Sequence, residues 1–177
     1  MRVLELARWR REIEGFLPHK PPMEELLRAL RAAVEAPETD SVRLVVIDDD
    51  WLKGKIGELC EERRPQKRGD LTAWLNAKGF KPGKPFLSEA PYLILVFSRG
   101  ERVGSAWIAV GYLLLALEEL GLGAVVCTPK NPGPAEELLN VPKDYKLQAI
   151  LPVGYPAGFK PSNERNELEE VVSFNEF

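Results

Sequence analysis

Residues 105–129, SAWIAVGYLLLALEELGLGAVVCTP, decide the fold that the sequence predicts. The first sixteen of these residues are apolar on almost every side of a helix, and a helix of this kind must lie at the centre of a protein. Gly121 follows as a helix C-cap, and AVVCT at residues 124–128 indicates a buried strand. The stretch therefore predicts a central helix that leads directly into a sheet. So much apolar helix surface also suggests contact with a partner subunit.

The remaining segments alternate between helical and strand patterns. Apolar runs predict buried strands at residues 42–47, 90–98 and 147–154. Helical spacing predicts a first helix that starts near Val3 and ends by Leu17–Pro18, and a second helix between two prolines at its start and Pro37 at its end. The interleaved order favours an α+β or α/β domain with a four- or five-stranded sheet.

The stretch from residue 48 to residue 88 combines a helix with a long irregular span. An aspartate run, Asp48, Asp49 and Asp50, suits the cap of a third helix, and it also leaves a cation site open as the less favoured interpretation. The span that follows is too long for a tight connection, which is typical of a lid or an arm. We expect one domain over residues 1–177, with a lid-like excursion at about 51–88 and a C-terminal arm at 154–177.

Composition excludes several functional classes. The chain has 177 residues, 45% of them hydrophobic, and a formal net charge of −3 with scattered cations, which argues against nucleic-acid binding. No apolar stretch approaches the length of a membrane span, so we expect a soluble, cytoplasmic protein with no membrane partner. Cys60, Cys127 and His19 are too few and too far apart for a zinc site or a disulfide framework, and we expect no metal.

The N-terminal stretch RWRREIEGF, residues 8–16, places three arginines before two glutamates. The arginines suggest an anion site. The glutamates suggest instead a solvated helix face on which Arg8 pairs with Glu12 and Arg10 with Glu14, four residues apart. The residues alone leave both interpretations open.

Four segments, in order, resemble the nitroreductase family of FMN-dependent oxidoreductases over nearly the whole chain. RREIEGF at 10–16 is similar to the family's RRSxRxF, and EAPETDSVRLVVI at 35–47 is similar to a helix that ends in APS before a polar loop. EAPYLILVFS at 89–98 and the stretch at 105–129 match the family's strand, long central helix and GLG. GYPAGFKPSNERNELEEVV at 154–172 matches GYP, a linker and RxPLEEVV.

The resemblance implies an α+β, nitroreductase-like fold with a mostly antiparallel sheet, in a homodimer with two FMN sites at the subunit interface. It implies that guanidinium groups hold the FMN phosphate, and that a loop of the other subunit approaches the flavin. Backbone after the "GLG" strand faces the reactive N5 edge, and Glu12 replaces the family's serine. The implied cofactor-binding residues are Arg10, Arg11, Glu12, Pro37, Glu38, Thr39, Asp40, Cys127, Thr128 and Arg165.

The function implied by the resemblance is an FMN-dependent NAD(P)H oxidoreductase that passes hydride, by a ping-pong mechanism, to nitroaromatic, quinone or flavin-type acceptors. The flavin carries the chemistry, so no side-chain catalyst is named. Aromatic residues of the excursion could cover the ring (Trp74, Phe80 and Phe86). Two alternatives stay open. Glu12, Glu14, Pro129 and Asn163 favour a protein that has lost tight flavin binding and acts as a ligand-binding or interaction module, and some relatives use the flavin to dehalogenate or fragment their substrates.

Overall fold

The computed structural model describes residues 2–60, 86–158 and 166–175, and its centre is an antiparallel sheet. Within these residues four strands lie in the order β1-β2-β4-β3. The strands are β1 (Val42–Ile47), β2 (Tyr92–Arg99), β3 (Gly123–Ala124) and β4 (Tyr145–Gly154). All three pairings are antiparallel. The predicted α+β class and the antiparallel sheet are confirmed.

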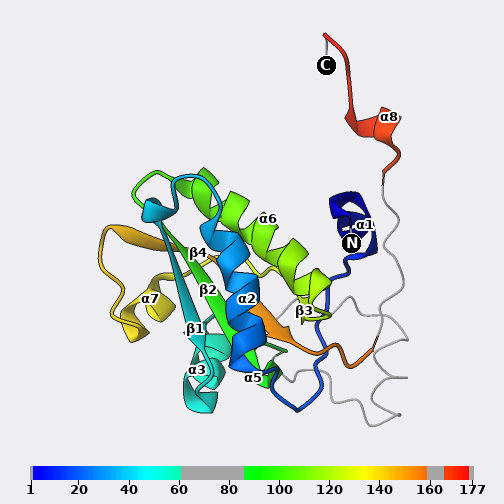
Figure 1. Ribbon diagram of the computed structural model, residues 1–177. Helices are drawn as coiled ribbons and strands as arrows, with labels where there is room; N and C mark the ends of the chain where they lie inside the picture. The colour runs from blue at the N-terminus through cyan, green and yellow to red at the C-terminus, as the bar shows by residue number, and fades with distance from the viewer. Residues whose placement is uncertain (1, 61–85, 159–165, 176–177) are drawn as a thin grey trace, which may run out of the picture.

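Helices cover both faces of this sheet (Figure 1). One face packs against α2 (Met23–Val34) and α6 (Val103–Glu119) in the larger core cluster. The other face packs against α3 (Asp50–Cys60), α5 (Phe86–Glu89) and α7 (Gly133–Leu138). Strand β2 lies between the two layers and is buried along seven of its eight residues, which explains why its sequence is an unbroken apolar run.

Helix α6 is apolar on its inner and its outer side. Ala109 and Leu113 are fully buried against the sheet layer, whereas Trp107, Ile108 and Tyr112 on the other side are about 40% exposed. The predicted central helix is therefore confirmed, and the described residues leave its outer side partly exposed. The terminal helices α1 (Val3–Trp9) and α8 (Leu168–Val171) lie away from the sheet (Figure 1). Among the described residues, no helix combines the length and the apolarity that crossing a bilayer requires.

The first helix is shorter than predicted. It ends at Trp9, and Arg11 Nη1 donates hydrogen bonds to the carbonyl oxygens of Arg8, Trp9 and Arg10 at 2.9–3.0 Å. These carbonyls have no helical partner at a helix end, so the guanidinium closes the helix there. Ile13, predicted to continue the helix, instead donates its N–H to Ala124 O at 3.1 Å. Ile13, whose spacing fitted a helix in the sequence, therefore lies at the edge of the sheet.

Two further predictions change in detail. The predicted strand at 124–128 is regular only at Gly123–Ala124, and Cys127 makes a single bridge to Ile150. The predicted cap of the third helix is confirmed, because Asp49 Oδ1 accepts a hydrogen bond from the Leu52 N–H at 2.8 Å. The irregular excursion begins and ends in the helices α3 and α5; the rest of it, including Trp74 and Phe80, lies outside the described residues.

The N-terminal segment and the start of the C-terminal arm are joined beside the end of β4. Leu17 N–H donates to Tyr155 O at 2.8 Å, and Ala157 N–H donates to Gly15 O at 3.0 Å. Tyr155 Oη donates to Glu25 Oε2 at 2.9 Å and ties this junction to α2. Gly154 lies at its centre, where a Cβ atom would come within 2.6 Å of Pro91 Cδ. The junction fixes the segment that carries Arg10–Glu12 relative to the sheet.

Substitution of Gly154 by alanine tests this close packing. We expect Gly154→Ala to lower the free energy of unfolding by about 1–3 kcal/mol, the usual cost of an overpacked site. Gly158→Ala is the matched control, because a Cβ atom there meets nothing within 4 Å. Urea unfolding followed by circular dichroism measures both. Equal stability of the two variants would contradict the packing at Gly154.

Candidate functional site

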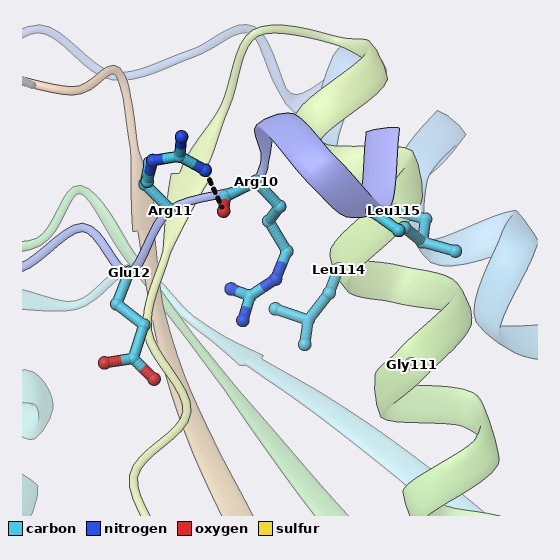
Figure 2. A pocket seen from close by; sticks show the side chains of 7 residues that line it. Arg10, Arg11, Glu12, Gly111, Leu114 and Leu115 are labelled. Atoms are coloured by element: carbon cyan, nitrogen blue, oxygen red, sulfur yellow. Dashed lines mark hydrogen bonds between the residues drawn. The ribbon is translucent and has the colours of Figure 1, made fainter. Parts of the chain in front are cut away.

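A cavity of about 540 Å³ lies between the end of α1 and the C-terminal half of α6. Figure 2 shows the side chains around it. The N-terminal segment contributes two arginines and a glutamate, and α6 contributes an apolar wall. The lining residues are Ala7, Arg10, Arg11, Glu12, Gly111, Leu114 and Leu115. Cations from one element thus face an apolar helix surface across an open space.

The two arginines of this cavity have different orientations. The guanidinium of Arg10 extends toward Leu114, and that of Arg11 lies on the other side of the segment (Figure 2). Arg11 is held there by the three carbonyl oxygens at the end of α1. Arg10 Nη1 is buried. Arg10 is therefore the cation aimed into the cavity, and Arg11 shapes the end of the helix.

Carboxylates oppose these cations. Glu12 lines the cavity, and its backbone lies beside Ala124 in a parallel bridge to β3. Burial raises the pKa of Glu118 on α6, and the positive charges of Arg10 and Arg11 oppose the rise. The alternative of one solvated helix face for Arg8 with Glu12 and Arg10 with Glu14 is wrong, because the helix ends at Trp9. The cavity is therefore a mixed-charge site: Glu12 comes from the same segment as the two arginines, and Glu118 acts on them from α6.

The predicted residues 37–40 lie at the other end of α6. The Glu38 carboxylate accepts a hydrogen bond from Ser105 Oγ at 3.1 Å and lies 3.6 Å from Arg102 Nη1. Glu38 has a φ of 56°, a left-handed backbone that costs free energy for a non-glycine residue. From Ser105 to Gly111, α6 rises by about 9 Å. The loop is thus anchored at the start of α6, away from the Arg10 cavity of its own chain.

Cys127 and Thr128 are the remaining described residues that were predicted to bind the cofactor. Cys127 exchanges two backbone hydrogen bonds with Ile150, at 2.9 and 2.8 Å, and its side chain packs with the core cluster on the α3 face. Thr128 is exposed. Arg165 lies outside the described residues. Of the residues predicted to bind the cofactor, Arg10, Arg11 and Glu12 line the cavity. Residues 37–40 lie at the other end of α6, and Cys127 and Thr128 are not among the lining residues.

Sequence reasoning missed the α6 wall and Glu118. Gly111, Leu114 and Leu115 were predicted only as parts of an apolar helix, and their spacing of three and four residues places them on one side of it. The available signal was a glycine in the middle of a strongly apolar helix, which is unfavourable there without a reason outside the helix. Nothing in the sequence pairs Glu118 with residues 10 and 11.

Comparison with known proteins decides the family. The family model "Nitroreductase family" matches residues 7–155. The chain belongs to the nitroreductase family. This confirms the resemblance that the four sequence segments indicate. The structure of an FMN-dependent nitroreductase from Clostridium difficile has the same fold, with a TM-score of 0.77 and 24% identity over 98% of this chain and 99% of the other.

More similar relatives within the nitroreductase family are deiodinases. The chain is 45% identical over 187 residues to the iodotyrosine deiodinase of Thermotoga neapolitana, with 99% of this chain and 98% of the relative covered. It is 36% identical to that of Drosophila melanogaster, covering 88% of this chain and 62% of the relative. An iodotyrosine deiodinase structure bound to FMN and 3-iodo-L-tyrosine has a TM-score of 0.82 and 42% identity, with 99% of this chain and 100% of the other covered.

These relatives correct the predicted function. The chain is an enzyme, as predicted, so the alternative of a mere ligand-binding or interaction module is wrong. The prediction of an NAD(P)H oxidoreductase for nitroaromatic, quinone or flavin acceptors is also wrong, because similarity at 36–45% identity is to deiodinases. The physical reason is that the predicted residues concern the phosphate and the flavin edge, which say nothing about the acceptor.

Stability as a function of pH tests the burial of Glu118. A carboxyl whose pKa is raised in the folded protein binds its proton more tightly there than in the unfolded chain. Its stabilising effect is present below the ordinary value of 4.5 and is lost as pH rises through the folded pKa. We therefore expect the Tm of Glu118→Gln, relative to the unaltered protein, to be highest at pH 7 and to fall as pH approaches 4.5.

Calorimetric scans between pH 4 and 8 measure this difference. Glu119→Gln gives the effect of removing an exposed carboxylate at the same end of α6. Parallel Tm curves for Glu118→Gln and the unaltered protein would contradict the burial of this carboxyl.

Proposed function

We propose that this enzyme is an FMN-dependent reductive dehalogenase that removes iodide from iodinated tyrosine. The observation that carries the proposal is 45% identity, over nearly the whole of both chains, to the Thermotoga neapolitana deiodinase. The match of folds to a deiodinase bound to FMN and 3-iodo-L-tyrosine, with a TM-score of 0.82, supports the same assignment. The sequence alone left open the possibility that the protein, like some relatives, uses its flavin to dehalogenate a substrate. The similarity to the two deiodinases favours that possibility.

The Arg10 cavity fits an FMN phosphate. Arg10 is aimed into it, and a guanidinium is well suited to bind the oxygens of a doubly negative phosphate. The α6 wall leaves open space at Gly111, where a Cβ atom would meet nothing within 4 Å. Arg10 would hold the phosphate from within the cavity, with Arg165 as a second predicted cation. Arg11 would join them only by leaving the three carbonyl oxygens at the end of α1. Glu12 weakens this attraction, and so does the half-buried carboxyl of Glu118 when it is ionised.

FMN supplies two electrons when it is bound and reduced. With those electrons and one proton, the carbon–iodine bond is replaced by a carbon–hydrogen bond, and iodide leaves. The chain's part is to bind and orient: the backbone at Cys127 and Thr128 would face the flavin edge, and residues 37–40 would approach the ring. No side-chain catalyst is proposed. NAD(P)H as the source of the electrons stays a prediction.

A homodimer follows from how the site is divided. Residues 37–40 and the Arg10 cavity lie at different ends of α6, so one chain does not bring them together. A second copy packed on the outer side of α6 would cover Trp107, Ile108 and Tyr112 and present its own loop to the cavity. Exposed apolar residues of the arm, including Leu168 and Phe174, would be covered in the same interface.

Iodide release tests the proposed function. We expect the purified protein to bind about one FMN per chain and, with dithionite as reductant under nitrogen, to convert 3-iodo-L-tyrosine to tyrosine and iodide. Chromatography and an iodide electrode measure the two products. Free FMN with dithionite is the chemical control. FMN-loaded protein that releases no iodide above this control would contradict the proposal.

Arg10 provides the matched variant for the cofactor site in this experiment. Arg10→Met removes charge-assisted hydrogen bonds worth about 1.5–3 kcal/mol, so we expect FMN to bind about 10- to 150-fold more weakly. Arg31→Met, at an exposed position of α2, is expected to leave the affinity unchanged. Quenching of flavin fluorescence measures the dissociation constant. Equal affinities of the two variants would remove Arg10 from the site.

Introducing a charged residue on the outer side of α6 tests whether two copies of the chain share each FMN site. We expect Ile108→Glu to give monomers, because a carboxylate would be buried in the subunit interface, and to weaken FMN binding at least about tenfold through loss of the partner's loop. Leu59→Glu, at a similarly exposed position of α3, is the control. Sedimentation and FMN titration measure both effects. A monomer that binds FMN with full affinity would show that one chain holds a complete site.

A further inference from the structure

Gly111 occupies an unusual place on α6. It lies near the middle of the seventeen-residue helix Val103–Glu119, where glycine is less favourable than alanine. It is exposed, and its φ lies in the ordinary helical range, so the backbone conformation does not require glycine. A Cβ atom at this position would meet nothing within 4 Å. Packing within the described chain therefore gives no reason for the missing side chain.

The reason for the glycine lies on the cavity side. Gly111 lines the 540 Å³ cavity together with Leu114 and Leu115, one turn further along the same side of α6. The side chains of the two leucines bound the cavity on this side. At Gly111 no side chain projects, and we call the open space left there the notch. Arg10, which lines the same cavity, extends its guanidinium toward Leu114, and Gly111 lies one turn before Leu114 on the helix (Figure 2). A ligand that binds to Arg10 and fills the cavity would therefore lie along the α6 backbone at residue 111.

We infer that Gly111 is the point where bound FMN comes closest to α6, so that residue 111 sets the width of the flavin site. The inference rests on the proposed function, because it takes FMN as the ligand of the Arg10 cavity. The part of FMN at this point is its phosphate-bearing chain, since Arg10 is the phosphate partner. This chain is slender and flexible, and it passes a helix backbone closely only where no Cβ atom projects.

The inference predicts opposite effects on stability and on binding. Gly111→Ala adds a good helix former without an internal clash, so the Tm of the FMN-free protein should rise by about 1–4 °C. The same methyl group narrows the cavity, so the dissociation constant for FMN should rise at least about tenfold. Gly111→Leu fills the notch and should abolish measurable FMN binding. A merely structural role for Gly111 would not weaken binding while the protein becomes more stable.

Gly54→Ala is the matched control. Gly54 lies inside α3, and a Cβ atom there also meets nothing within 4 Å, but it is not part of the cavity lining. This variant should gain a similar Tm increment and bind FMN as the unaltered protein does. Calorimetry of the FMN-free proteins, fluorescence titration with FMN and sedimentation are applied to all four proteins.

The possible outcomes separate this inference from the proposed function. An unaltered protein that binds no FMN overturns both. If the unaltered protein binds FMN and releases iodide, but Gly111→Ala binds FMN within about threefold of it, only the role of Gly111 is overturned. If Gly111→Ala turns a dimer into monomers, the notch is a subunit contact and the inference is also wrong. Weaker binding by a stable variant of unchanged oligomeric state supports it.

Discussion

The structure depends on a helix that is apolar on two sides, of which the described residues cover only the inner one. The inner side of α6, including Ala109 and Leu113, is fully buried, and each leucine so buried contributes about 1.5–3 kcal/mol. The outer side, including Trp107 and Ile108, stays exposed. Packing against the sheet fixes the helix in place. Its uncovered side is then available for a ligand at one end and for a second copy along its length.

The N-terminal segment turns this helix surface into a cavity. Arg11 closes α1 early, and Ile13 then pairs with Ala124 at the edge of the sheet. Because the segment is fixed both at β3 and at the Tyr155 junction, Arg10 projects toward α6. The arginines of the N-terminal stretch thus have different partners: Arg11 binds backbone carbonyl oxygens, and Arg10 extends into the cavity. Glu118 of α6 interacts electrostatically with both of them.

The difference between a deiodinase and a nitroreductase does not lie in these groups. A phosphate held by guanidinium and a flavin edge facing backbone suit any flavoenzyme of this family, whichever acceptor it uses. The acceptor is chosen by whatever surrounds the exposed face of the ring. This is why full-length similarity to deiodinases corrected the function while leaving the family, the fold and the enzyme assignment intact.

The sequence by itself determined the α+β class, the central helix and the strands β1, β2 and β4, because long apolar runs have few alternatives to burial. It also placed Arg10 and Arg11 near a helix end. Only the tertiary structure decided where that helix stops, since Arg11 and Ile13 find partners that no local pattern reveals. It likewise decided that Glu38 anchors to Ser105, 67 residues away, and that Gly111 and Arg10 line the same cavity. Such contacts join distant segments, and residue periodicity carries no information about them.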